Sequence, residues 1–123
     1  MIRVVADANA LMMPFQFSIN IDAELSRILG DCEIIVPKPI VGELERLSET
    51  KHEARAALKL AKSRKIVPIK SSGDDAVLEL AEQESAYIIT NDVALIKRAR
   101  ASRIKIIRLK ESSRLAIDGG WLE

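Results

Sequence analysis

Short apolar segments alternate along this chain with longer segments in which apolar residues recur every three or four positions. The short segments are rich in Val and Ile, as buried strands are, and the longer ones have the period of helices with one buried face. The expected strands cover residues 2–6, 34–36, 66–69, 87–90 and 104–109. The expected helices cover residues 21–29, 39–47, 53–64, 72–84 and 93–103. Because strand and helix alternate throughout, we predict an α/β fold, a three-layer α/β/α sandwich around a parallel sheet of about five strands.

Turn and capping residues set the ends of several elements. Gly30 is expected to end the first helix, and Pro39 suits the first turn of the next one, where its missing amide proton would be unpaired anyway. The run from Ser72 to Asp75 has the pattern of a capping box. Residues 11–18 show no clear period and contain Pro14, so an irregular connection is predicted. Its larger apolar side chains are expected to pack on the core: Met12, Met13, Phe15 and Phe17.

Length and composition narrow the class of protein. At 123 residues the chain has the size of one domain, and we predict a single domain over residues 1–123. A hydrophobic fraction of 48% and a charged fraction of 30% exclude intrinsic disorder. No apolar run approaches the roughly 18 residues of a membrane span and the N-terminus lacks a signal peptide, so a cytoplasmic protein without a membrane partner is expected. Cys32 is the only cysteine, which rules out an internal disulfide and a thiolate zinc cluster.

The net charge of +1 conceals a basic C-terminal part. After Asp92 the chain carries eight Lys and Arg residues against three acidic ones. Four of these cations are candidate contacts for RNA phosphates: Lys97, Arg98, Arg100 and Arg103. A solvated helical face explains the same residues equally well, and both interpretations stay open. With aromatic residues at only 3%, a base-stacking surface is not expected.

Four acidic residues follow the predicted strands or open the helices after them, and they are Asp7, Glu43, Asp74 and Asp92. Because the chain leaves parallel strands at one edge of the sheet, we expect these carboxylates to share a site there. Carboxylates brought together repel one another, and a hard divalent cation, Mg²⁺ or Mn²⁺, offsets that repulsion. Such a cation can activate water and neutralise charge on a phosphate. Since the chain has no Gly-rich phosphate loop, the pattern favours metal-assisted phosphodiester hydrolysis over nucleotide binding.

Each acid also has a structural interpretation. Asp74 and Asp92 are good helix caps, and Glu43 can be a solvated helical acid. Asp7 is harder to explain, because a carboxylate at the end of a buried strand needs partners. Asp75 suits the capping box and leaves Asp74 as the freer ligand, although the pattern alone does not separate the two. A receiver-like signalling domain also gathers acids around Mg²⁺, but it needs adjacent acids after the first strand and an acceptor aspartate after the third, and this chain has neither.

The same residues resemble the ordered motifs of PIN-domain nucleases. The resemblance rests on Asp7-Ala8-Asn9, on Glu43 in Val-Gly-Glu-Leu, on the helix beginning Asp74-Asp75, and on Thr90-Asn91-Asp92. It covers nearly the whole chain and is closest to archaeal single-domain relatives of the PIN protein that processes small-subunit ribosomal RNA, which are sometimes grouped with VapC-type toxins. In that family the helix aspartate stands sixteen residues before the threonine of the last motif, which selects Asp74. Ala8 departs from the pattern, because this branch often has a threonine there.

The resemblance implies a Mg²⁺- or Mn²⁺-dependent endoribonuclease that leaves a 3′ hydroxyl and a 5′ phosphate. Its catalytic metal ligands would be Asp7, Glu43, Asp74 and Asp92. By similarity, Asn9 and Thr90 orient ligands or substrate through hydrogen bonds, with Asn91 and Asp75 in supporting positions. A catalytically inactive PIN fold that binds RNA or protein is the alternative.

The biological partner stays open at this level. A toxin would have an antitoxin partner, whereas a processor of ribosomal RNA would associate with pre-ribosomal particles. Family resemblance makes a homodimer plausible, with Met12, Met13, Phe15 or the Trp121 tail as contacts. His52, the only histidine, is expected at the surface without a catalytic role.

Overall fold

The computed structural model describes residues 1–118, which form a sheet of six strands in the order β3-β2-β1-β4-β5-β6. The strands are β1 (Ile2–Ala6), β2 (Cys32–Pro37), β3 (Lys65–Val67), β4 (Tyr87–Ile89), β5 (Ile106–Glu111) and β6 (Arg114–Ile117). β1 to β5 are parallel, and β6 runs antiparallel to β5. β1 lies between β2 and β4, so its Val4, Val5 and Ala6 have no exposed surface. The predicted fold class is confirmed, with one antiparallel strand added.

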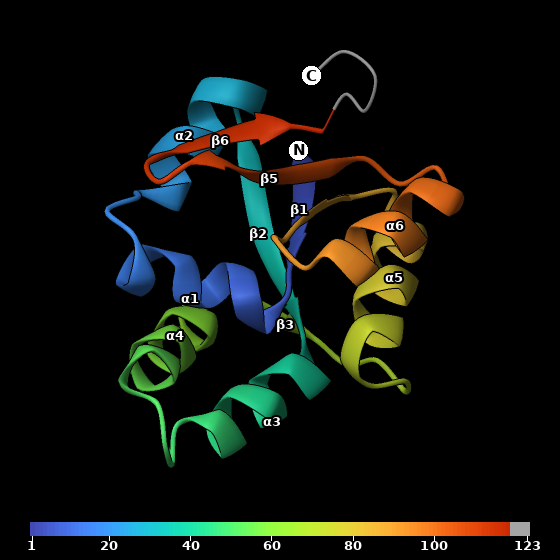
Figure 1. The fold of residues 1–123 in the computed structure, drawn as a ribbon. Coiled ribbons are helices and arrows are strands. Elements are labelled where there is room, and N and C mark those ends of the chain that lie inside the picture. Colours follow the sequence, from blue (N-terminus) through green and yellow to red (C-terminus); the bar gives the residue numbers. More distant parts are fainter. Residues whose placement is uncertain (119–123) are drawn as a thin grey trace.

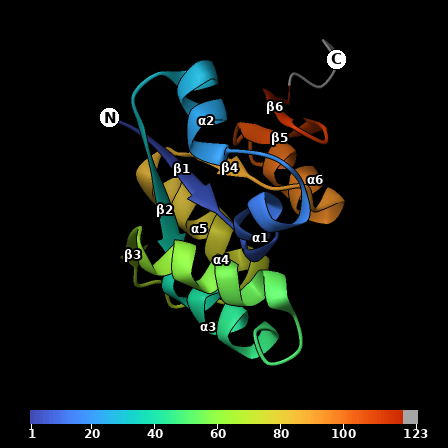
Figure 2. The same ribbon diagram turned by 90° about the vertical axis from the view of Figure 1, so that its left-hand side faces the viewer.

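Six helices cover the sheet within the described residues. They are α1 (Ala8–Gln16), α2 (Ile21–Leu29), α3 (Lys38–Leu47), α4 (His52–Lys62), α5 (Gly73–Glu84) and α6 (Val93–Ala101). α5 and α6 lie on one side of the sheet and α1, α2 and α4 on the other, while α3 lies beyond the carboxyl end of β1 (Figures 1 and 2). α4 packs closely against α1 and α3 because its inward residues Ala54, Ala57 and Ala61 are small and fully buried.

The irregular connection predicted over residues 11–18 is wrong, because α1 occupies Ala8–Gln16 with Pro14 inside it. Proline within a helix costs about 3 kcal/mol, since it removes one hydrogen bond and crowds the preceding turn. Burial of Leu11, Met12 and Met13 offsets this, at roughly 1.5–3 kcal/mol for each large apolar side chain. The helix also ends at Gln16, within one turn of the proline.

Two further local predictions, one at the end of α1 and one at the start of α5, need correction. Phe15 and Phe17 are 46% and 39% exposed rather than packed in the core. The capping box at Ser72 is not formed, since that side chain makes no capping hydrogen bond. Gly73 follows with φ at +57°, so the backbone departs from the regular first turn that a capping box needs. Asp75 instead pairs with Arg98.

β6 lies outside the predicted elements because Leu115 alone of its four residues is buried. Its outer edge is held by two side chains of α2. The backbone amide of Leu115 donates to Glu24 Oε1 at 2.9 Å, and the Leu115 carbonyl accepts from Arg27 Nη2 at 2.9 Å. Glu24 and Arg27 are also paired with each other. These side chains take the place of a further strand and close the exposed edge of the sheet.

We expect Glu24→Gln to loosen β6. The Arg27 guanidinium and the Leu115 amide hold the pKa of Glu24 at about 2, below its ordinary 4.5. The carboxylate therefore contributes stability above pH 4.5 that is lost as the pH falls toward 2. Hydrogen exchange at pH 6 should show several-fold lower protection of the Leu115 amide in the variant. Glu45→Gln, an exposed acid on α3, is the control, and unchanged protection in Glu24→Gln would contradict this contact.

Three further predictions concern single residues or the membrane. His52 is exposed at the first position of α4, and Cys32 is half-buried at the start of β2. Trp121 lies outside the described residues. In residues 1–118 no helix is both long and apolar enough to cross a membrane.

Candidate metal centre at the carboxyl edge of the sheet

Asp7 occupies the point where β1 ends and α1 begins, and its side chain is 5% exposed. Its Oδ1 accepts from the Ala10 amide at 2.7 Å as the N-cap of α1, and its Oδ2 accepts from the Thr90 hydroxyl at 2.5 Å. Burial raises the pKa of Asp7 to about 7, although its hydrogen bonds with Thr90 and Ala10 act in the opposite direction. Asp74 and Asp92 raise this pKa further. The fold thus holds a carboxyl group in a low-dielectric position beside other acids, where a cation is needed to keep it charged.

Thr90 links the ends of β1 and β4. Its hydroxyl donates to Asp7 and accepts from the backbone amide of Asp92 at 3.0 Å. Asp92 then caps α6, since its Oδ1 accepts from the Ala94 and Leu95 amides at 2.9 and 3.2 Å. β1 and β4 are neighbours although they are far apart in sequence, and ligands bind in open α/β sheets at such a reversal of strand order. Asp92 is therefore both the N-cap of α6 and a member of the group of acids at the carboxyl edge of the sheet.

Asn9 and Asn91 form a second set of links at the same edge. Asn9 Oδ1 accepts from the Asn91 amide at 3.0 Å, and Asn91 Oδ1 accepts from the Leu109 amide at 2.9 Å. The first turn of α1, the loop after β4 and strand β5 are joined in this way. These amide side chains position the loops that carry Asp7 and Asp92.

Glu43 and Asp74 complete the group of acids. Burial raises the pKa of both carboxyls. Asp74 also raises the pKa of Glu43 and of Asp7, and Asp92 raises that of Asp74. Asp74 therefore interacts with each of the other three acids and is the electrostatic centre of the group. Asp75, one residue later, is instead exposed, with its Oδ1 2.6 Å from Arg98 Nη2.

Arg46 was not among the residues singled out from the sequence. It lies one turn after Glu43 on α3, and its positive charge lowers the pKa of Glu43. The i, i+3 spacing to a candidate ligand is the sequence signal that identifies it.

The donor chemistry fits a hydrated hard cation. In residues 1–118 no three His, Cys, Asp or Glu side chains are close enough together to enclose a metal ion. Mg²⁺ does not require such a cage, because it retains several waters and is bound through one or two carboxylates together with substrate phosphates. Asp7, Asp74 and Asp92 are oxygen donors, and the charge of Asp92 raises the pKa of both Asp7 and Asp74. A divalent cation between the three, held partly through water, would relieve this repulsion.

Comparison with known proteins agrees with this architecture. The family described as "PIN like domain" matches residues 4–112, which cover all four acids. The chain belongs to this PIN-like domain family.

Two relatives of this PIN domain come from archaea. One, named Ribonuclease VapC9, is from Archaeoglobus fulgidus and is 31% identical over 93% of this chain and 87% of its own length. The other, Ribonuclease VapC4 of Methanocaldococcus jannaschii, is 32% identical over 97% of this chain and 98% of its own length. Among solved structures, the PIN domain endonuclease Utp24 superposes with a TM-score of 0.80 at 22% identity, covering 94% of this chain and 90% of its own. VapBC2 from Rickettsia felis, solved with a promoter DNA fragment, gives a TM-score of 0.62 at 15% identity, covering 87% of this chain and 98% of its own. The structural likenesses show the fold.

The four predicted RNA-binding cations of the PIN domain occupy different settings. Arg98 forms an ion pair with Asp75, and Arg100 donates two hydrogen bonds of 2.6 and 2.7 Å to the Asp118 carboxylate. Lys97 is exposed on α6 and has no ion pair among residues 1–118. The structure does not gather these four residues into one cluster around the acids.

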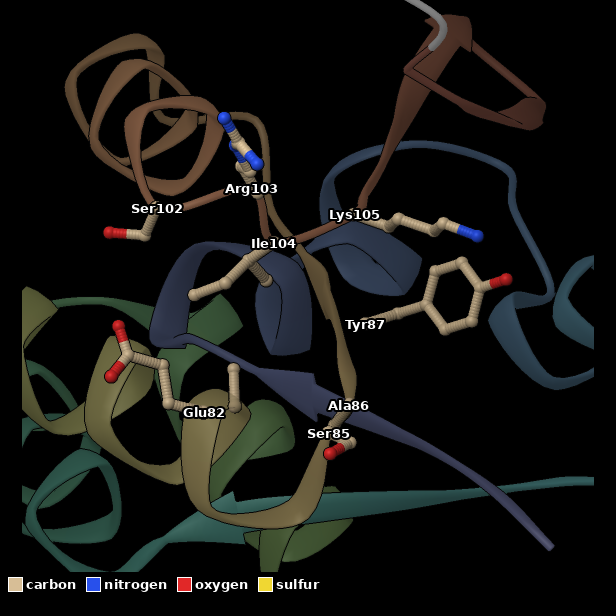
Figure 3. Close-up of a pocket in the computed structure, with 9 residues that line it drawn as sticks. Glu82, Ser85, Ala86, Tyr87, Ser102, Arg103, Ile104 and Lys105 are labelled. Atoms are coloured by element: carbon tan, nitrogen blue, oxygen red, sulfur yellow. The ribbon is translucent and has the colours of Figure 1, made fainter.

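Arg103 lies at the opposite edge of the sheet, by the amino ends of β4 and β5. It lines a cavity of about 420 Å³ between the last turns of α5 and α6, together with Ser85 and Lys105 (Figure 3). Lys105 Nζ lies 5.8 Å from the centroid of the Tyr87 ring that borders the same cavity. This cavity and the acidic group are at different ends of the parallel strands, so Arg103 is not part of the candidate metal centre.

Proposed function

We propose that this PIN domain is a metal-dependent endoribonuclease whose active site is the group Asp7, Glu43, Asp74 and Asp92. One observation carries the proposal. Asp7 is a buried carboxyl group held by Thr90 and Ala10, with Asp74 and Asp92 near enough to disfavour its charged form. A buried carboxyl group that other acids repel, at the point where the strand order reverses, is energetically costly, and cation binding would offset that cost. The names of the two archaeal relatives support ribonuclease activity.

Each residue has a defined task in the proposed reaction. Asp7, Asp74 and Asp92 would hold Mg²⁺ or Mn²⁺ directly or through water, with Thr90 keeping Asp7 in place. Once bound, the cation lowers the pKa of a water molecule and neutralises charge on the phosphate. Glu43 would be a further ligand, or it would accept the proton of the attacking water. Its raised pKa favours the second of these roles. Hydrolysis would leave a 3′ hydroxyl and a 5′ phosphate. Lys97, on the exposed face of α6, would contact a neighbouring phosphate.

A toxin role is the biological setting we propose, because both archaeal relatives carry VapC names. The partner would be an antitoxin. Phe15 and Phe17 expose apolar surface at the end of α1, and Phe15 lines a cavity of about 290 Å³ with Pro14 and Ile19. This face offers the partner an apolar contact. Met12 and Met13 are buried and unsuited to the homodimer contact predicted for them. Phe15 stays a candidate for that role, as does the Trp121 tail, which lies outside the described residues. Co-purification with pre-ribosomal particles, without an antitoxin, would favour the processing role instead.

A catalytically inactive RNA- or protein-binding PIN fold is the second candidate. It is favoured by one finding: among residues 1–118, no three acidic, histidine or cysteine side chains are grouped closely enough to hold a metal ion by themselves. The two candidates differ in whether RNA is cut.

We expect RNA cleavage to require a divalent metal. The purified protein, incubated with single-stranded and hairpin RNA, should cut in Mg²⁺ or Mn²⁺ and stop when EDTA is added. Activity should return when excess metal is restored, because the four acids need a cation to bind an anionic phosphate. Gel analysis and end-labelling would show the cut positions and a 5′ phosphate. Cleavage that continues in EDTA would contradict the metal mechanism, and absence of cleavage in every metal would favour the inactive candidate.

A further inference from the structure

Helix α3 has a glycine in its interior, directly before Glu43. Gly42 is partly exposed, and its backbone has helical geometry. Apart from the backbone of its own helix, a Cβ placed there would have one near neighbour, the Arg46 Nη1 atom one turn later at 3.8 Å, which is an ordinary contact distance. Glycine is among the least favourable residues within a helix, and neither packing nor backbone geometry requires it here. The missing side chain leaves bare backbone beside a candidate metal ligand.

The guanidinium of Arg46 lies beside the backbone that Gly42 leaves uncovered, which we call the bare patch. Helical side chains point toward the N-terminus of their helix, and Arg46 accordingly reaches back over Gly42 and Glu43. Its side chain forms no hydrogen bond or ion pair with any group in residues 1–118, although its charge acts on Glu43. Arg98 also acts on one of the acids, Asp74, but it forms an ion pair of 2.6 Å with Asp75. Unlike Arg98, Arg46 keeps its hydrogen-bond donors available within residues 1–118.

We propose that Gly42 and Arg46 form a subsite for an RNA phosphate next to the scissile one, with the bare backbone at Gly42 admitting the RNA strand and Arg46 binding the phosphate. The inference rests on the proposed ribonuclease function. An RNA strand approaching four acids is repelled wherever the cation does not reach. A guanidinium at the rim offsets that repulsion and binds phosphate oxygens through two parallel N–H donors. Arg46 is therefore a substrate-binding residue, and Gly42 provides the room it needs.

RNA binding tests this subsite without relying on cleavage. Asp7→Asn protein, with and without Arg46→Ala, would be titrated with a fluorescent single-stranded RNA in Mg²⁺ at several salt concentrations. Loss of Arg46 should weaken binding about tenfold and reduce the salt slope by about one. Arg103→Ala removes the same charge at the opposite edge of the sheet and is the matched control, for which a much smaller change is expected. Equal losses in the two variants would mean general attraction to basic surface and would overturn the subsite.

Neutral methylphosphonate linkages locate the contact. Replacing one phosphate of the RNA at a time should reveal a position whose neutralisation weakens binding to the parent Asp7→Asn protein about tenfold but leaves binding to its Arg46→Ala derivative unchanged. Gly42→Ala should raise the thermal stability slightly, because alanine is the better helix former, and should still weaken RNA binding, because its methyl group covers the exposed backbone at Gly42. If no linkage shows this coupling, the subsite is wrong. If neither the wild-type protein nor Asp7→Asn binds RNA in Mg²⁺, the proposed function fails together with the subsite, whereas binding unaffected by Arg46→Ala overturns the subsite alone.

Discussion

Asp7→Asn protein is expected to lose RNA cleavage by roughly 100-fold or more, because even removing a partner of a metal ligand typically costs 10- to 100-fold. The substitution changes the shape of the site little. The Asn carbonyl can still accept from the Ala10 amide, and its NH₂ group can donate to the Thr90 hydroxyl. What disappears is the negative charge that would bind the cation. Initial rates in saturating Mg²⁺ or Mn²⁺ measure the loss, and circular dichroism establishes that the variant is folded.

The neighbouring acids on α5 supply the control for this result. Asp75 is exposed and engaged with Arg98, whereas the pKa of Asp74 is raised by burial and by Asp92. Asp75→Asn should therefore keep cleavage within a few-fold of the wild type, while Asp74→Asn should lose it as Asp7→Asn does. Metal-dependent cleavage that persists undiminished in purified Asp7→Asn protein would overturn the assignment of the active site.

The same substitution should change how stability depends on pH in the absence of metal. Burial holds the pKa of Asp7 at about 7 in the folded protein, against 3.8 ordinarily. Below pH 3.8 the Asp7 carboxyl is protonated in both the folded and the unfolded protein, so its burial does not lower the free energy of unfolding. As the pH rises from 3.8 through 7, the unfolded chain releases this proton before the folded one does, so the folded protein loses stability. The loss amounts to at most about 4 kcal/mol above pH 7, at 1.36 kcal/mol for each pKa unit.

Urea unfolding in EDTA between pH 5 and 8.5 measures this effect. The free energy of unfolding of the wild-type protein should fall across that range. That of Asp7→Asn should change less with pH and should exceed the wild-type value at the upper end. Asp31→Asn, which alters an exposed acid before β2, is the control and should follow the wild type. Saturating Mg²⁺ should restore part of the wild-type stability at high pH through binding to the folded state. A stability curve for Asp7→Asn that parallels the wild type would contradict a raised pKa at this residue.

Local patterns in the sequence predicted most of the elements. Buried segments such as Val4 to Ala6 are continuous in apolar residues because strands covered on both faces are in contact with protein everywhere. Helix α2 was predicted with its observed ends, since Gly30 stops it with φ at +74°. α1 was missed because Pro14 outweighs its pattern locally, while the burial that compensates for the proline comes from other parts of the chain. β6 was missed because only Leu115 in it is buried, and because the Glu24–Arg27 pair that holds its outer edge lies far away in sequence.

The candidate site divides in the same way. By itself the sequence determined which acids follow the strands, because that depends only on the order of elements and on the parallel direction of the strands. Only the tertiary structure decided what each acid experiences there. The burial of Asp7, its hydrogen bond with Thr90 and the ion pair between Asp75 and Arg98 all depend on segments that meet after folding. Electrostatic energies follow distance and solvent exposure, which neighbours in sequence do not specify.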